Sequence, residues 1–210
     1  MIVIVDYGMG NLASIANMLK KAGAATTITS DAATIRAAGK LILPGVGAFE
    51  SGMRNLAERG LIEPLNDAVL NRRVPVIGLC LGMQLMTRHS EEGTAAGLGW
   101  IDAETRRFRV ADQSLKVPHM GWNTMRFVKE HPLADALDNP RFYFVHSYHL
   151  VCNDESDVLG KTHYGYEFAA SVAHDNILGV QFHPEKSHRF GLQLLKNFAA
   201  MDVAAIAKAS

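Results

Sequence analysis

Short strand-like runs separated by helical segments are the feature that most constrains how this chain can fold. The runs in the first 80 residues are residues 1–5, 25–29, 40–43 and 75–79. The first, MIVIV, is continuously apolar, as expected for a strand buried on both faces. Apolar residues then recur at helical spacing from Leu12 to Ala22, and Gly23 follows as a stop signal. This alternation with short connections predicts a parallel sheet with helices on both faces.

The second half of the chain has a different pattern. Its candidate strands are residues 100–108, 116–122, 141–150, 157–164, 168–174 and 177–183. A last helix is expected at residues 189–200. We therefore predict an α/β fold with a central, mostly parallel sheet, flanking helices and added antiparallel strands. No linker or low-complexity segment marks a boundary, so residues 1–210 are expected to form a single domain.

The charges of the chain are balanced, with 21 Lys and Arg against 21 Asp and Glu. Such a chain has no strong field to recruit nucleic acid or an anionic membrane, and neither is expected as a partner. Asp6 interrupts the apolar start at once, which argues against a secretory signal, and the most apolar stretch, residues 76–86, is too short to span a bilayer. We expect a cytoplasmic protein whose two cysteines, Cys80 and Cys152, remain thiols.

Cys80 lies in the pattern G-x-C-x-G, directly after the fourth candidate strand and before a helical run. This is the order of the elbow that presents the nucleophile in G-x-S-x-G hydrolases, with sulfur in place of oxygen. Gly78 and Gly82 permit a tight turn, and the N-terminus of a helix favours a thiolate. The backbone N–H of Leu81 would then donate to an oxyanion beside the sulfur. A free cysteine is more often a small buried apolar residue, and Cys152 is interpreted in that way.

A base and the group that orients it are expected in the segment at residues 182–185. Residues i and i+2 of an extended chain share a face, so His183 and Glu185 should project to the same side. A cysteine nucleophile needs a base to take and return its proton, and that base needs a third group to hold its tautomer. Two other histidines, His146 and His149, lie at i and i+3 on a candidate strand and therefore face opposite ways. With no further ligands nearby in the sequence, no metal site is expected.

Six motifs spread over nearly the whole chain carry a resemblance to a known family. GLCLGMQ at residues 78–84 and QFHPEKS at residues 181–187 resemble the signatures of class I, triad-type glutamine amidotransferases. Four more are similar to those of the glutaminase subunits of imidazole glycerol phosphate synthases: DYGMGN at 6–11, LPGVGAF at 43–49, MGWN at 120–123 and YFVHSY at 143–148. The resemblance implies a flavodoxin-like α/β fold and hydrolysis of L-glutamine to glutamate and ammonia through a glutamyl thioester, without a cofactor.

The resemblance also implies roles for individual residues. The catalytic triad would be Cys80, His183 and Glu185. The oxyanion donors would be Leu81 and, in the loop at residues 44–47, Val46 and Gly47. The glutamine pocket would be lined by Gly47, Gln84, His146, Ser147 and Tyr148.

A partner protein is part of the same resemblance. The ammonia would pass through a tunnel into a barrel-shaped cyclase or synthase subunit, in a heterodimer. That partner would make imidazole glycerol phosphate and an aminoimidazole carboxamide ribotide in histidine biosynthesis. The surface facing it would carry Asn11, Met120, Gly121, Trp122, Asn123 and Lys186.

Three alternative functions are weighed against this one. Residues 8–13 fit G-x-G-x-x-G/A, with Asp31 roughly 20 residues on, as in an NAD-dependent oxidoreductase, although Asp6 and Tyr7 separate the strand from the first glycine. A non-enzymatic scaffold with a degenerate triad is the second, although all three triad groups are present. The third is a closely similar glutaminase subunit that feeds ammonia to a synthase of surface-polysaccharide sugars, because residues 116–120 and 186–191 also resemble such relatives.

Overall fold

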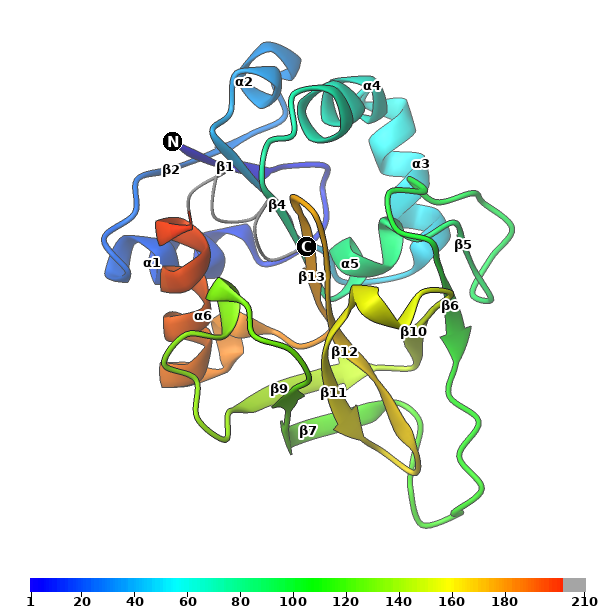
Figure 1. Cartoon of the computed structure of the whole chain (residues 1–210). Helices are drawn as coiled ribbons and strands as arrows, with labels where there is room; N and C mark the ends of the chain where they lie inside the picture. Colours follow the sequence, from blue (N-terminus) through cyan, green and yellow to red (C-terminus); the bar gives the residue numbers. More distant parts are fainter. Residues whose placement is uncertain (202–210) are drawn as a thin grey trace.

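The structure, a computed structural model, describes residues 1–201, and strands and helices alternate in the first half as the sequence predicts (Figure 1). The elements up to residue 85 are β1 (Ile2–Val5), α1 (Leu12–Lys21), β2 (Thr26–Thr29), α2 (Ala32–Arg36), β3 (Lys40–Leu43), α3 (Phe49–Glu58), α4 (Ile62–Asn66), the π-helical turn η1 (Asp67–Asn71), β4 (Val76–Leu79) and α5 (Leu81–Leu85).

Short strands dominate the rest of the described chain. They are β5 (His89–Ser90), β6 (Ala103–Arg107), β7 (His119–Thr124), β8 (Arg126–Phe127), β9 (Arg141–His146), β10 (Tyr148–Cys152), β11 (Val158–His163), β12 (Glu167–His174) and β13 (Ile177–Val180). The helical elements are the 3₁₀ turns η2 (Pro132–Ala134), η3 (Glu155–Asp157) and η4 (Pro184–Lys186), and the final helix α6 (His188–Ala200). Among residues 1–201, no helix has both the length and the apolar character needed to cross a membrane.

Eleven strands form one sheet in the order β2-β1-β3-β4-β13-β12-β10-β6-β5, with β11 beside β12 and β8 beside β11. The five strands from β2 to β13 run parallel to one another. Strands β12, β10 and β6 continue the sheet in antiparallel pairs, and β7 and β9 form a separate antiparallel pair. This is the fold class predicted from the sequence, a mostly parallel central sheet extended by antiparallel strands.

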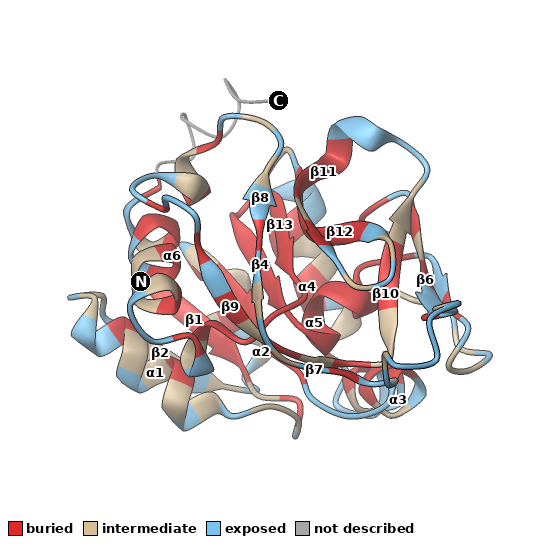
Figure 2. Cartoon of the chain, turned by 90° about the horizontal axis from the view of Figure 1, so that it is seen from below, coloured by how far each residue is buried: buried red, intermediate tan, exposed pale blue. Residues whose placement is uncertain are grey.

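Each face of the parallel strands has its own helical cover. Val3 and Val5 of β1 belong to the core that also contains the buried residues of α2, α3, α4 and α5. Ile2 and Ile4, one residue out of phase, belong to the core shared with α1 and α6. Figure 1 shows these two groups of helices on different sides of the sheet, and Figure 2 shows the buried strands between them.

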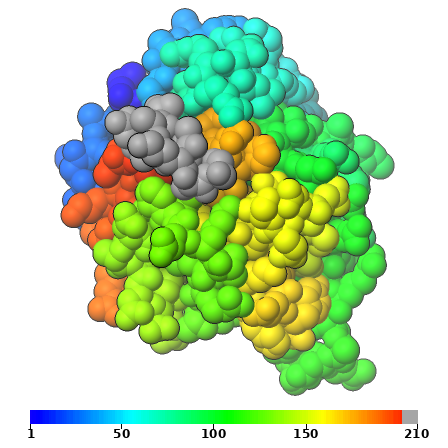
Figure 3. Space-filling model, viewed as in Figure 1, coloured from blue at the N-terminus to red at the C-terminus, as the bar shows by residue number. Residues whose placement is uncertain are grey.

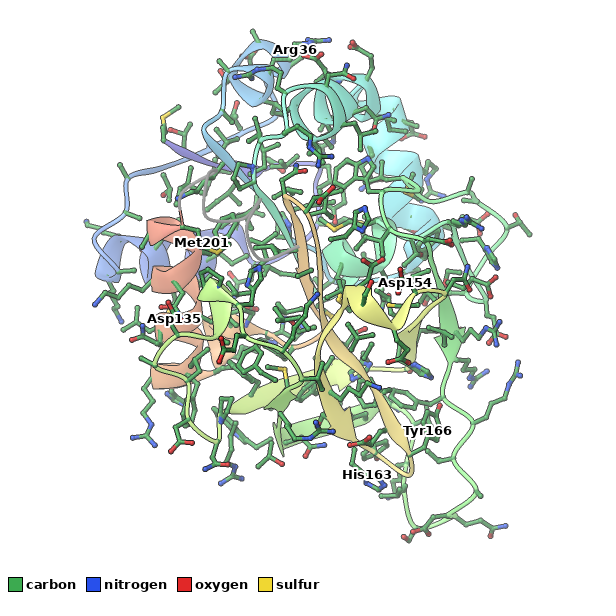
Figure 4. All side chains as sticks on the ribbon, viewed as in Figure 1. Arg36, Asp135, Asp154, His163, Tyr166 and Met201 are labelled. Atoms are coloured by element: carbon green, nitrogen blue, oxygen red, sulfur yellow. The ribbon has the colours of Figure 1, made fainter. Side chains whose placement is uncertain are left out.

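The later strands extend the molecule away from this three-layered part. In the space-filling view, residues up to about 90 occupy the upper part of the visible face and the strands after residue 100 most of the lower part (Figure 3). The β11–β12 hairpin points into this lower part, with His163 and Tyr166 near its tip (Figure 4).

The prediction of one strand over residues 141–150 was wrong. Ser147 interrupts it, so β9 pairs with β7 while β10 pairs with β6 and β12. A run of strand-forming residues does not reveal a change of pairing partner along its length, because both halves satisfy the same pattern. The strands β5 and β8 were also not predicted, because two residues are too few to show a periodic pattern.

Candidate active site

Three adjacent parallel strands, β3, β4 and β13, direct their carboxyl ends to one edge of the sheet. The loop at residues 44–47 follows β3, Cys80 follows β4, and His183 lies three residues after β13. Loops at the carboxyl ends of parallel strands are the usual place for a ligand site in an open α/β sheet. The topology therefore brings together three segments that are far apart in the sequence.

Cys80 forms a strained turn between β4 and α5. Its backbone has φ 53° and ψ −109°, in a region that side-chain-bearing residues rarely adopt. The glycines on either side allow this turn because there is no room for a side chain: a Cβ on Gly78 would lie 2.6 Å from the backbone nitrogen of Met83, and one on Gly82 would lie 1.8 Å from the carbonyl oxygen of Leu43. The elbow predicted from G-x-C-x-G is thus the local structure, although α5 has only five residues and a correspondingly short dipole.

The strain at Cys80 leads to a stability prediction. Cys80→Gly should melt above Cys80→Ala by about 2–4 °C, because glycine adopts a positive φ without the cost, of order 1 kcal/mol net, that any Cβ imposes. Calorimetry of the two variants measures the difference, and both lack the sulfur, so lost sulfur contacts cancel. An alanine variant at least as stable as the glycine variant would show that the turn is relaxed.

His183 and Glu185 form a buried pair. Nδ1 of His183 lies 2.9 Å from Oε1 of Glu185, and each side chain is 3% exposed. The predicted contact is present, but the reason given for it was wrong: β13 ends at Val180, and the two residues meet across the 3₁₀ turn η4, not along an extended strand. The backbone of His183 is held on both sides, since its N–H donates to the carbonyl oxygen of Tyr143 and its carbonyl accepts from the Ser187 hydroxyl.

The environment of His183 favours its protonated form. Burial by itself lowers the pKa, but the Cys80 sulfur and the Glu185 carboxylate outweigh burial and raise the pKa of His183 to about 9. Its Nε2 is buried and makes no hydrogen bond within residues 1–201, which leaves it available for a proton shared with the sulfur. Since the folded-state pKa lies above the ordinary value of 6.5, this group contributes stability below pH 6.5 that is lost as the pH rises through about 9.

A cavity of about 310 Å³ opens beside these groups. Every residue expected to line the glutamine pocket or to donate to the oxyanion lies in its wall. Its lining is Val46, Gly47, Cys80, Leu81, Gln84, Glu92, Pro118, Val145, His146, Ser147, Tyr148 and His183. The sequence analysis assigned Glu92, Pro118 and Val145 no place in the site. Glu92 lies in a loop that no motif marks, whereas Pro118 and Val145 lie in segments that the analysis noted for other reasons. The cavity is of a size suited to a small ligand.

The loop after β3 is anchored at one end and exposed at the other. The hydroxyl of buried Tyr7 donates to the carbonyl oxygen of Pro44, and burial together with the nearby Cys80 sulfur raises the pKa of Tyr7, so that it stays a donor. Val46, in contrast, is 43% exposed, and Gly47 has φ 114°. Both line the cavity, so the peptide between Val46 and Gly47 lies at its wall with glycines at 45 and 47 to permit rotation.

The residues expected at a partner surface lie in different environments. Met120 and Trp122 are exposed on the outer face of β7, and Lys186 is exposed with its ammonium 5.7 Å from the ring centre of Tyr143. Tyr143 also contacts Trp122, so Trp122 and Lys186 share one surface. Gly121 lies between Met120 and Trp122 on β7, and Asn11 is exposed at the N-cap of α1. Asn123 instead directs its amide inward, donating to the carbonyl oxygen of His163.

Two buried histidines connect Asn123 to the cavity. His119 Nδ1 lies 3.0 Å from His146 Nε2, and His146 Nδ1 lies 2.7 Å from the carbonyl oxygen of Tyr148, which can only accept. Each ring therefore carries its proton on Nδ1, and the Asn123 amide reaches the remaining His119 Nε2 at 3.3 Å. Burial lowers the pKa of His119 to about 4 and that of His146 to about 3, so both are neutral at neutral pH. We call these two residues the neutral histidine pair.

Other groups weighed in the sequence analysis have structural explanations. The Asp31 carboxylate caps α2, accepting from both the backbone N–H and the hydroxyl of Thr34 at 2.7 and 2.6 Å. His149 bonds the Tyr166 hydroxyl at 2.9 Å. Within residues 1–201, no group of three or more His, Cys, Asp or Glu side chains is placed to hold a metal ion.

Comparisons with known proteins identify the family of the chain. The model of the glutamine amidotransferase class-I family matches residues 3–201. A protein of Methanococcus maripaludis named imidazole glycerol phosphate synthase subunit HisH 2 is 53% identical, over 94% of this chain and 98% of its own length. A protein of the same name from Pseudomonas aeruginosa is 51% identical, over 96% of this chain and all of its own.

Solved structures of low sequence identity share the fold. A crystal structure described as a glutamine amidotransferase superposes with a TM-score of 0.68 at 19% identity, covering 92% of this chain and 98% of that one. The glutaminase domain of a Trypanosoma brucei CTPS, with bound acivicin, gives 0.63 at 15% identity over 96% and 94%. By its family match and its relatives, the chain belongs to the class-I glutamine amidotransferases and, within them, to the HisH subunits of imidazole glycerol phosphate synthase.

Proposed function

We propose that this protein hydrolyses L-glutamine to glutamate and ammonia and supplies the ammonia to the cyclase subunit of imidazole glycerol phosphate synthase in histidine biosynthesis. The observation that carries the proposal is the meeting of a strained cysteine elbow with a buried His–Glu pair at one 310 Å³ cavity. Membership of the HisH subunits supports the pathway. The single domain spans residues 1–210 and works in the cytoplasm.

The reaction begins with Cys80 as thiolate and His183 as imidazolium. The sulfur attacks the side-chain carboxamide carbon of glutamine, and the carbonyl π electrons move to oxygen. When the tetrahedral intermediate collapses, the C–N bond breaks and His183 Nε2 gives its proton to the departing ammonia. Neutral His183 then takes a proton from water, whose oxygen attacks the thioester, and the C–S bond breaks to release glutamate and restore the thiolate. Glu185 holds Nδ1–H throughout, which fixes the tautomer and stabilises the imidazolium.

Two backbone groups are assigned to the oxyanion of both tetrahedral intermediates. The N–H of Leu81 follows the nucleophile directly, as in other elbow hydrolases. The loop peptide at Val46 and Gly47, which also lines the cavity, supplies the second. A donor of this kind contributes roughly 10²–10³ in rate.

The remaining lining is assigned to the amino-acid end of glutamine. Gly47, Gln84, His146, Ser147 and Tyr148 form the pocket walls. The Glu92 carboxylate, which accepts from the N–H of Phe49 at 2.8 Å, places negative charge at the cavity and suits the α-ammonium of the substrate.

The partner is a barrel-shaped cyclase subunit, bound as a heterodimer. Its contact surface on this chain comprises Asn11, Met120, Gly121, Trp122, Asn123 and Lys186. Exposed Met120 and Trp122 are the apolar anchors, since large apolar and aromatic side chains dominate binding at interfaces. Asn123 contributes through the backbone of β7, because its amide faces inward.

The isolated chain is expected to be a poor glutaminase that its partner activates. The Val46 peptide can turn either way between its glycines, and a carbonyl turned to the cavity would remove one oxyanion donor. Glutamate release should therefore rise by about 10²-fold or more on addition of the synthase partner and its ribonucleotide ligand. Turnover is measured for the chain alone, with partner, and with partner plus ligand; equal rates in all three would contradict the switch.

Co-purification from the native source identifies the partner independently. Recovery of a cyclase of histidine biosynthesis supports the proposed pathway. Recovery of a synthase of surface-polysaccharide sugars would reassign the product while leaving the glutaminase chemistry in place.

A further inference from the structure

Gln181 is fully buried two residues before His183, and neither the sequence analysis nor the proposed mechanism gives it a role. Its Oε1 accepts from Nε2 of Gln84 at 3.0 Å, and its Nε2 donates to Sγ of Cys80 at 3.6 Å. Nε2 of Gln84 also donates to the carbonyl oxygen of Tyr148 at 3.2 Å. These contacts form one row of hydrogen bonds from the wall of the cavity to the sulfur, and we call it the amide row.

The direction of the amide row is fixed at its outer end. A backbone carbonyl oxygen can only accept, so Gln84 must present its NH₂ group to Tyr148. The second N–H of that group is then directed to Gln181, which must accept with its side-chain oxygen. The NH₂ group of Gln181 is consequently the end that faces Cys80. Reversing the Gln181 amide would place two NH₂ groups together at Gln84 and a carbonyl oxygen against the sulfur, losing both bonds.

A thiolate accepts a hydrogen bond much more strongly than a thiol does, because the acceptor is then charged. A donor held against the sulfur therefore stabilises the thiolate relative to the thiol. Gln181 cannot move away from this position easily. Its backbone N–H donates to Ala170 at 2.9 Å, and the preceding residue, Val180, accepts from the N–H of Cys80 at 2.8 Å. The same strand end thus anchors both the donor and the nucleophile.

We propose that Gln181 is a positioning residue whose side-chain amide holds the Cys80 sulfur in its thiolate form and couples it to Gln84 in the glutamine pocket. The proposal rests on the proposed function, since it assigns Gln181 to the same nucleophile. It adds a third group, besides His183 and the elbow, that prepares the sulfur before substrate arrives.

The test is the pH dependence of Cys80 alkylation by iodoacetamide, in a Cys152→Ala background so that only one thiol reacts. Gln181→Met keeps the size of the side chain and removes the donor; it should move the midpoint of the alkylation curve up by about one pH unit. Gln181→Glu keeps an acceptor for Gln84 and faces the sulfur with a carboxylate, so it should move the midpoint up as well. The Gln181→Glu variant provides the measurement if the methionine variant does not fold.

Asn197→Leu is the matched control. Asn197 is buried on α6, away from the three strand ends of the site, and its amide donates to the carbonyl oxygens of Leu133 and Asp135 at 3.0 and 2.7 Å. Its loss should lower the melting temperature and leave the alkylation midpoint unchanged. An unchanged midpoint in the Gln181 variants overturns the proposal, even if their activity falls. Alkylation needs neither glutamine nor the partner, so the two proposals fail separately. Absence of glutaminase activity in the unaltered protein together with its partner and the ribonucleotide ligand would instead refute the proposed function.

Discussion

Cys80→Ala is expected to lower glutamine hydrolysis by about 10⁴-fold or more, because no thioester can form without the sulfur. The complex of this variant with the synthase partner should keep its ammonia-driven activity at high pH, where free ammonia is abundant. The two activities are measured on the same preparation, as glutamate release and as synthase product formation. More than a trace of remaining glutaminase activity would show that Cys80 is not the nucleophile.

Cys152→Ala is the matched control for that experiment. Cys152 ends β10, and burial together with the carboxylates of Asp157, Glu155 and Asp154 raises its pKa to about 12, so it remains a thiol at neutral pH. Its replacement should leave turnover unchanged and cost at most about 1–2 kcal/mol of stability. A large loss of turnover in this variant would point to a general effect of thiol removal on the fold.

His183→Asn is expected to damage glutaminase activity almost as severely as loss of Cys80. The imidazole bonds the buried Glu185 carboxylate and interacts with the Cys80 sulfur. Members of such a catalytic unit are strongly non-additive. The double variant with Cys80→Ala should accordingly be little worse than either single variant. Additive losses in the double variant would separate the two residues into independent roles.

Glu185→Gln should be milder than His183→Asn. The amide keeps the size of the side chain and a hydrogen bond to Nδ1, but it removes the charge that helps to raise the pKa of His183. The basic limb of the pH–rate profile should therefore move to lower pH, because His183 loses its proton more easily. A Glu185 variant worse than the His183 variant would contradict the assigned roles.

The chemistry of the site could be predicted from the sequence because it is encoded locally. Five residues around Cys80 determine a turn with no space for side chains at Gly78 and Gly82. The glycines of the G-x-C-x-G pattern indicate this restriction in the sequence. His183 and Glu185 are two residues apart, so any local conformation that turns both inward brings them together. The prediction of their contact survived a wrong assignment of the strand that carries them.

Contacts between distant segments could not be predicted in this way. Gln84 and Gln181 are 97 residues apart, and nothing in their local sequence shows that one amide faces the other. Glu92 reaches the cavity from an irregular loop, and Ser147 redirects the chain between two sheets. Each depends on how the strands are ordered in the sheet, which periodicity within a single strand does not specify.

The two rings of the neutral histidine pair are internal probes that nitrogen NMR can observe, so no label need be attached to the protein surface. Both rings are protonated on Nδ1 and buried at 3% and 6% exposure, so their ring N–H protons should exchange slowly with water and give separate resonances. His146 lines the cavity, and His119 contacts the inward-facing amide of Asn123. Asn123 belongs to β7, the strand whose outer face carries Met120 and Trp122. Glutamine should perturb the His146 signal first and the partner the His119 signal first, so that one spectrum distinguishes occupancy of the pocket from docking.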